Sequence, residues 1–327
     1  MKKGMVNVLT PAYNGEKYVH RLLESILCQT YPYISMIVIN DGSTDETEYV
    51  INSYVERFKK KGYSLTLYSQ VNGGVSNAIN NGLKYVDGDY LVWPDIDDWY
   101  SSPYCIEKLV EAIERYGDEV GVARSSYNRV SENNLSELVP VIHNGLDAEP
   151  HDLFEDAVMQ TNKFWFGGYM IKTKFLDSFI PNRVIFQTRY GGQNCQLLWP
   201  YLYYTKCVTV DEPLIAILSR NNSHCRGLLQ SIEKKLQQQD DYMKTYEMVL
   251  NGIPELSEDQ KNKYLKVLSS EILWRKRNLC LSAGRYRLAY LYHRNFLNKT
   301  KPITLRKILG FPFRLVVSVM KNLFVKK

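Results

Sequence analysis

Three carboxylates stand within four residues directly after a short apolar run. Asp95, Asp97 and Asp98 follow the run Tyr90–Trp93. Carboxylates this close repel one another unless a cation joins them. Hard oxygen ligands on a short loop suit Mg²⁺ or Mn²⁺, which keep waters and bridge substrate phosphates. The spacing favours a divalent-metal site over the alternative, a solvated acidic turn before Ser102-Pro103.

A second acidic position follows an earlier apolar run. Asp41-Gly42-Ser43-Thr44-Asp45 comes directly after Ile37–Asn40. An Asp followed by Gly and Ser or Thr can bind a ligand, but it can equally cap the next helix. Taken alone, these residues leave both alternatives open.

The elements that must position these carboxylates alternate between strand and helix. The spacing of apolar residues predicts helices at about 15–28, 45–60 and 75–86. Alternating strands and helices predict a mostly parallel sheet covered on both faces, with ligands at the carboxyl ends of the strands. The predicted strands are Val6–Leu9, Ser35–Ile39, Ser64–Tyr68 and Tyr90–Trp93. Polar and glycine residues gather at their ends, in Thr10–Asn14, Asn40–Ser43, Asn72–Gly74 and Asp95–Asp98.

The rest of the chain divides in two. Residues 119–222 show no sustained period and are expected to be irregular and mixed. Helix-period apolar residues then occupy Gln230–Leu250, Ser257–Ser282 and Arg285–Leu297, with a Gly-Ile-Pro break at 252–254.

Composition excludes several function classes. The chain has 327 residues, 45% of them hydrophobic, enough for a sizeable core. None of its six cysteines forms a Cys-x-x-Cys pair, which argues against a zinc or redox site. No secretion signal is expected at the start of the chain. The cysteines are therefore predicted to be reduced thiols in a cytoplasm. The loop after the first strand, Thr10–Asn14, lacks Gly-x-Gly-x-x-Gly and any other glycine-rich phosphate loop. This argues against a dinucleotide oxidoreductase and a sugar-nucleotide pyrophosphorylase.

The order and spacing of these motifs resemble family 2 glycosyltransferases. The resemblance rests on Val8–Asn14, on Val38–Asp45 and on the Asp-x-Asp at 95–97, and it covers about the first hundred residues. It implies an α/β GT-A fold, which is Rossmann-like and binds nucleotide-diphosphate sugars, followed here by a helical C-terminal region. It also implies a nucleotide-diphosphate sugar donor, a Mn²⁺ or Mg²⁺ cofactor and inversion at the anomeric carbon.

Carried over position by position, the resemblance assigns a donor site. Pro11 and Tyr13 would border the base, and Asp41 would hydrogen-bond it. Asn72 would contact the nucleotide, Asp95 the ribose and Asp97 the metal. A carboxylate that accepts from the imide N–H of uracil favours a UDP or dTDP donor. The metal would stabilise the diphosphate leaving group.

A later segment resembles the closing Arg-x-x-x-His of the family. Arg220 and His224 are four residues apart in Ser219–His224. In the family, this Arg and His lie near the diphosphate and metal, so both join Asp97 as candidate catalytic residues, and His224 joins it as a candidate metal ligand. A lone His is more often structural, but the position of His224 four residues after Arg220 favours contact with the diphosphate.

Two positions depart from the family pattern. Where the family often has Ala-Arg-Asn, this chain has Ala78-Ile79-Asn80, so another cation must replace the arginine. Where the family has its general base, in Glu-Asp-Trp or similar, this chain has Gln193-Asn194. Amides bind hydroxyls but do not take a proton at neutral pH, so these two are acceptor-site candidates only. Asp98 and His224 are conceivable substitutes for the base.

Charge is distributed unevenly along the chain. The net charge is +6. The sequence after Glu271 contains 14 Lys and Arg residues and no Asp or Glu, while residues 1–271 carry 27 basic and 35 acidic side chains. The basic end, residues 301–327, mixes these charges with Leu, Ile, Val and Phe and holds no apolar run long enough to span a bilayer. We expect it to lie on an anionic membrane surface, with a partner-packing helix as the alternative. No nucleic-acid-binding motif accompanies it.

These observations predict three regions and one activity. Residues 1–225 form the GT-A catalytic domain, 226–300 the helical region and 301–327 the membrane-proximal tail. The expected enzyme, a hexosyltransferase at the inner face of the cell membrane, transfers a sugar to a glycan or lipid-linked acceptor in surface-polysaccharide biosynthesis. Because of Gln193-Asn194, a non-catalytic member that binds nucleotide sugar or glycan is the alternative.

Overall fold

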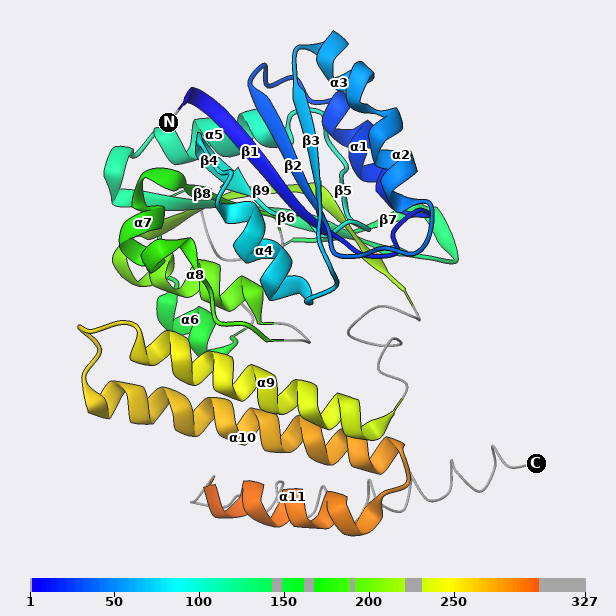
Figure 1. Cartoon of the computed structure of the whole chain (residues 1–327). Helices are drawn as coiled ribbons and strands as arrows, with labels where there is room; N and C mark the ends of the chain where they lie inside the picture. The colour runs from blue at the N-terminus through cyan, green and yellow to red at the C-terminus, as the bar shows by residue number, and fades with distance from the viewer. Residues whose placement is uncertain (1, 143–148, 162–167, 189–191, 221–230, 300–327) are drawn as a thin grey trace. The chain divides into compact units, whose positions relative to one another are not determined.

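A computed structural model describes residues 2–142, 149–161, 168–188, 192–220 and 231–299. The chain forms two compact units, Met1–Asn221 and Asn222–Lys327. The first is a mixed α/β domain, and the described part of the second is helical (Figure 1). The predicted fold class, an α/β domain followed by a helical region, is therefore confirmed.

The first unit begins with four parallel strands. The strands β1 (Lys2–Ala12), β2 (Ile34–Asn40), β3 (Ser64–Ser69) and β4 (Gly88–Val92) lie in the order β3-β2-β1-β4. They overlap all four apolar runs that predicted them. Burial explains the agreement: β2 is buried at six of its seven residues, as expected for a strand covered on both faces.

Helices cover both faces of this parallel half. The helices α1 (Val19–Leu27), α3 (Val55–Lys61) and α5 (Cys105–Glu114) bury apolar side chains together with Val8 of β1. The helix α4 (Val75–Leu83) lies on the opposite face, where a Cβ added to Gly82 would come within 2.1 Å of Leu9 Cδ1. The helix predicted at 45–60 is two helices, α2 (Thr47–Ser53) and α3, separated at Tyr54.

The region predicted to be irregular is instead largely regular. It contains the strands β6 (Val120–Ser131), β7 (Asn134–Val141), β8 (Tyr169–Lys172) and β9 (Lys206–Ser219), and the helices α6 (Phe154–Met159), α7 (Leu176–Phe179) and α8 (Gln193–Tyr204). The sheet continues β4-β8-β6-β9-β5, where β5 is Trp99–Tyr100, and β7 pairs with β6. The first seven residues of β6 are all buried, Arg124 and Ser125 among them, so polar residues hide the apolar pattern of this strand.

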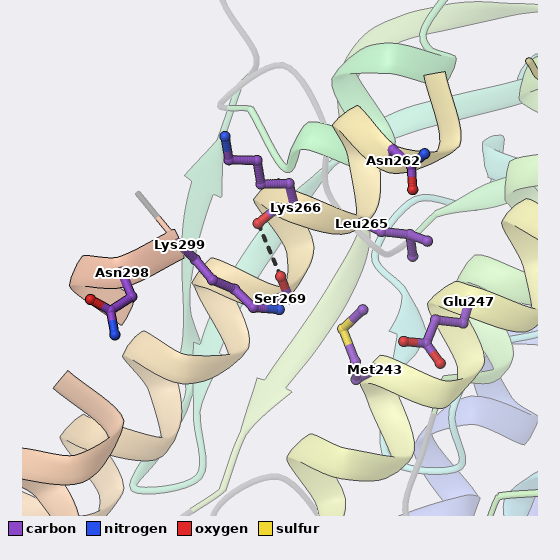
Figure 2. Close-up of a pocket in the computed structure, with 8 residues that line it drawn as sticks. All are labelled: Met243, Glu247, Asn262, Leu265, Lys266, Ser269, Asn298 and Lys299. Carbon is purple, nitrogen blue, oxygen red and sulfur yellow. Dashed lines mark hydrogen bonds between the residues drawn. The ribbon is translucent and has the colours of Figure 1, made fainter. Parts of the chain in front are cut away.

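The second unit contains α9 (Ile232–Asn251), α10 (Glu258–Ser282) and α11 (Tyr286–Lys299). Ser257 and Gln260 form a capping box at the start of α10, and Ser231 caps α9 by accepting from Lys234 N. Figure 2 shows a pocket of about 410 Å³ in this unit. None of the predicted site residues lines it; its lining is Met243, Glu247, Asn262, Leu265, Lys266, Ser269, Asn298 and Lys299. Among the residues that the structure describes, no helix is long and apolar enough to cross a bilayer.

Candidate active site

The ends of β1, β2 and β4 bring three loops to one edge of the sheet. In the parallel register Ala12 pairs with Asn40, and Val8 pairs with Val92. The Thr10 hydroxyl donates to the Pro94 carbonyl oxygen over 3.2 Å, which ties the end of β1 to the loop after β4. The predicted donor-site residues from these three strands therefore gather at the carboxyl edge, where ligands bind in such sheets.

The loop after β1 is locked onto the loop after β2. Asn14 adopts a left-handed conformation with φ 48°, and its backbone N–H donates to Ser43 Oγ over 3.0 Å. Its side-chain Oδ1 accepts from Thr44 N over 2.8 Å, and Gly15 N donates to Thr47 Oγ1 over 2.7 Å. This bracing fixes the backbone beside Pro11 and Tyr13, which are both half-buried.

Asp41 is buried and tied to the start of α4. Its Oδ1 accepts from Gly73 N and from Gln70 Nε2, each over 2.8 Å, and its Oδ2 accepts from Gly74 N over 2.8 Å. Gly74 is the N-cap of α4, so the carboxylate also lies where the helix dipole favours negative charge. The carboxylate thus holds the two glycines that precede the first residue of α4, and one acceptor position of Oδ2 stays open within the described residues.

Asn72 lies on the exposed loop that Asp41 organises. Its Nδ2 donates to the Asp41 carbonyl oxygen over 2.9 Å. The approach of the two segments is close, because a Cβ on Gly42 would lie 2.9 Å from Asn72 N, and Gly42 has φ +70°. Only glycine fits this turn, which presents Asp41 and Asn72 side by side.

Asp97 faces the end of β9. Its Oδ2 forms an ion pair with Arg220 Nε at 2.6 Å, and both side chains are largely buried. The Arg220 guanidinium also stacks over the Tyr18 ring, 4.4 Å from its centroid. Residues 97 and 220, far apart in the sequence, therefore form one charged group.

The two neighbouring carboxylates, Asp98 and Asp95, have different surroundings. Asp98 Oδ1 accepts from Leu218 N over 3.0 Å, which fixes the end of β9 two residues before Arg220. Although the Asp95 residue is exposed, protein atoms crowd its carboxyl; this desolvation and the Asp97 carboxylate raise the pKa of Asp95 to about 7, while Arg220 opposes the rise. Desolvation, Asp97 and Asp95 raise the pKa of Asp98. The cluster is thus a place where added positive charge is electrostatically favoured.

The amide pair begins α8. Trp93 Nε1 donates to Asn194 Oδ1 over 2.8 Å, joining α8 to the end of β4 two residues before Asp95. Because the oxygen of this amide is used by Trp93, Asn194 presents its Nδ2 as a donor. Gln193 is the first residue of α8 and is half-buried. His224 lies outside the described residues.

The profile of glycosyl transferase family 2 matches residues 7–168. Residues 7–168 belong to glycosyl transferase family 2. The matched segment contains Asp41, Asn72 and all three clustered carboxylates.

Curated relatives agree with this family over part of their length. The chain is 35% identical over 117 residues to the glycosyltransferase GlyA of Streptococcus pneumoniae, covering 36% of this chain and 16% of GlyA. It is 31% identical over 136 residues to the minor teichoic acid biosynthesis protein GgaB of Bacillus subtilis, covering 40% of this chain and 15% of GgaB. The matched region thus spans well under two thirds of these relatives.

Solved structures share the GT-A fold. Staphylococcus aureus TarS 1–349, in complex with UDP-GlcNAc, matches with a TM-score of 0.64 at 17% identity, over 90% of this chain and 81% of that one. The mannosyltransferase PcManGT of Pyrobaculum calidifontis, in complex with GDP-Man and Mn²⁺, matches with a TM-score of 0.55 at 16% identity, over 100% of this chain and 89% of that one. At these identities the likeness concerns the fold.

The carboxylates of this family 2 domain fit a divalent cation in their donor chemistry. In the described part of the chain no three His, Cys, Asp or Glu side chains form a ready metal cage. Mg²⁺ and Mn²⁺ sites that bridge phosphates need only one or two protein carboxylates, the rest coming from substrate and water. Asp97, with Asp95 beside it, supplies that number.

Three residues of this edge were not singled out from the sequence. Gln70 and Asn77 support Asp41, and Trp93 holds Asn194. Their only sequence signal was position, since Gln70 follows β3 and Trp93 follows β4, at strand ends where ligands gather.

Proposed function

We propose that this chain is a metal-dependent, inverting glycosyltransferase that transfers a sugar from a UDP-linked donor to a glycan or lipid-linked acceptor of a surface polysaccharide. The observation that carries the proposal is the Asp97–Arg220 ion pair beside Asp95, at the edge where Asp41 and Asn72 also lie. UDP-GlcNAc is bound by TarS 1–349, and GgaB is named for teichoic acid biosynthesis, which supports the donor and acceptor classes.

Each residue of the site would have a separate role in sugar transfer. Asp41 and Asn72 would hold the base between Pro11 and Tyr13, and Asp95 would meet the ribose. Asp97 would hold Mn²⁺ or Mg²⁺, which supplies positive charge against the diphosphate as the glycosidic bond breaks. Arg220 would turn from Asp97 to the same diphosphate, and His224 would assist there. Arg220 would also supply the cation that Ile79 does not provide.

Asp97→Ala tests this assignment. We expect loss of donor hydrolysis and transfer and weaker Mn²⁺-dependent UDP binding, while circular dichroism shows a folded protein. Asp177→Ala is a matched control, because Asp177 also pairs with an arginine, Arg183, at 2.7 Å but on an exposed surface. Unchanged hydrolysis by Asp97→Ala would remove Asp97 from the site, and NMR of the product anomer would decide between inversion and retention.

A second candidate function has one observation in its favour. Trp93 fixes the amide of Asn194, which stands where the family has its general base. The second candidate is therefore a non-catalytic member that binds nucleotide sugar or glycan. Metal-dependent donor hydrolysis, measured without acceptor, separates the two. For the enzyme, Asn194→Ala should reduce transfer more than hydrolysis, because only the acceptor loses its hydrogen-bond donor. Equal losses would assign Asn194 a structural role.

The proposal extends to the organisation of the chain. Residues 1–225 would be the catalytic domain, 226–300 a helical region and 301–327 a basic tail that holds the enzyme on the cytoplasmic face of an anionic membrane.

A further inference from the structure

The hydrogen bonds around Asp41 determine how many donors it can still accept. An ionised carboxylate has about four acceptor positions. In the described residues Gly73 N and Gln70 Nε2 occupy both positions of Oδ1, and Gly74 N occupies one of Oδ2. One acceptor position remains, on Oδ2.

The two glycine donors are fixed by the fold, whereas the third donor is a side chain. Gly73 and Gly74 donate through backbone N–H groups at the start of α4, and a Cβ on Gly73 would lie 2.8 Å from Asn77 Oδ1. These two backbone hydrogen bonds to Asp41 therefore persist in any variant that keeps the loop. Gln70 alone can be removed without touching the backbone.

The Gln70 amide has a defined orientation. Its Nε2 donates to Asp41 Oδ1 over 2.8 Å and to Asn77 Oδ1 over 2.7 Å, while its Oε1 accepts from Asn81 Nδ2 over 2.5 Å. Because Asp41 can only accept, rotating the amide by half a turn would bring two oxygens together. Lys84 Nζ closes this row of amides by donating to Asn81 Oδ1 over 2.8 Å.

Nucleobases differ in the number of donors that they offer to such a carboxylate. Uracil and thymine offer one imide N–H between two carbonyls. Guanine offers two adjacent donors, N1–H and N2–H₂, and both can bond to one carboxylate only if each of its oxygens has an open acceptor position. Cytosine places an acceptor, N3, at the position of the imide N–H, so a carboxylate oxygen that faces N3 repels it.

We infer that Gln70 is a specificity-determining residue that acts through Asp41: by saturating Oδ1 it leaves one acceptor position, which selects uracil or thymine against guanine. The inference rests on the proposed function, in which Asp41 faces the base. It assigns two separate tasks, since Asp41 rejects cytosine by charge and Gln70 rejects guanine by occupying the second oxygen.

Binding of UDP, GDP and CDP with Mn²⁺, measured by calorimetry on the full chain, tests the inference. Gln70→Met keeps the length of the side chain but removes its hydrogen-bond donors. One of the two acceptor positions of Asp41 Oδ1 is then open, and Gly73 N still occupies the other. We expect the preference for UDP over GDP to fall about tenfold, the size of one hydrogen bond to a charged group, while the preference for UDP over CDP stays unchanged. Lys84→Met, at the exposed end of the same row, is the control and should change neither ratio.

The design separates selectivity from mere loosening of the loop. A purely structural role for Gln70 would weaken all three nucleotides by one common factor and would overturn the inference. Asn81→Leu keeps Gln70 but removes the bond to its Oε1, together with the Asn81 bonds to Asn77 Oδ1 and Lys84 Nζ. It should shift the UDP-to-GDP ratio in the same direction by less than Gln70→Met, and it serves as the second variant if Gln70→Met does not fold. Failure of the wild type to bind UDP would contradict the proposed function, and the inference with it, whereas UDP binding with an unchanged ratio in both variants would contradict the inference alone.

Discussion

At the scale of single residues, Asp41 combines support of α4 with a place in the proposed base pocket. Asp41→Asn keeps the size of the side chain but replaces one acceptor oxygen with an NH₂ donor. Whichever way the new amide turns, that donor faces Gly74 N–H or the pair Gly73 N–H and Gln70 Nε2. We expect the free energy of unfolding to fall by about 1–3 kcal/mol and UDP affinity to fall by at least about 1 kcal/mol.

Denaturation and calorimetry on the same variant measure these two losses. A fall in stability with unchanged UDP affinity would show that Asp41 only caps α4 and that the base lies elsewhere.

The partners of these residues explain what the sequence could and could not reveal. Asp95, Asp97 and Asp41 could be proposed from the sequence because carboxylates after strands are a local signal. The pairing of Asp97 with Arg220, 123 positions later, and the bond from Trp93 to Asn194 depend on strands and helices meeting in space. No spacing rule gives such contacts, so the roles of Gln70 and Trp93 could not be predicted.

At the scale of elements, the segment before α8 is held by two amides. Asn80 of α4 donates to the Ile185 carbonyl oxygen over 2.9 Å and accepts from Ile185 N over 2.8 Å. Gln196 of α8 makes the same pair of bonds with Phe186, over 3.0 and 2.6 Å. The two side chains therefore pair with residues 185 and 186 as a neighbouring strand would, and they hold these residues against α4 and α8.

Asn80→Ala should disturb the acceptor side and spare the donor side. It leaves the buried N–H and C=O of Ile185 without a partner, at a cost of about 1–3 kcal/mol in stability. We expect faster hydrogen exchange at residues 185 and 186 and slower transfer, with UDP affinity unchanged. Lost UDP affinity with normal exchange would contradict this division.

The strands themselves show where apolar periodicity succeeds. The four parallel strands were predicted because their buried residues are mostly apolar, as with Val6, Val8 and Leu9 in β1, although β1 also buries Asn7 and Thr10. The strand β6 was missed because it buries Arg124, Ser125 and Ser126, and α8 was missed because it is buried over most of its surface and carries Pro200. Burial on every side removes the polar face that makes a helix recognisable.

At the scale of the whole molecule, we expect the basic segment 301–327 to bind the protein to an anionic membrane surface. Residues 301–327 lie outside the described residues, and their sequence contains seven Lys and Arg and no Asp or Glu. Each basic residue near an anionic surface contributes about 1 kcal/mol, screened over about 8 Å at physiological salt. Vesicles with anionic lipid should therefore sediment the full-length protein, and less of it as salt rises.

Removing residues 301–327 should abolish this sedimentation and leave donor hydrolysis intact. Neutral vesicles are the control. If truncation instead dissociates an oligomer by light scattering and leaves lipid binding unchanged, the tail packs against a partner.

The ion pair between Arg220 and Asp97 has a consequence for the order in which ligands arrive. If Asp97 holds the metal as proposed, a cation that approaches it would compete with Arg220 for Asp97 Oδ2, while a nucleotide diphosphate would offer that arginine other oxygens. Each ligand thus relieves the obstacle met by the other, and thermodynamic linkage makes the benefit mutual. We therefore expect the protein to bind the metal weakly without nucleotide, and the metal and the nucleotide diphosphate to bind cooperatively.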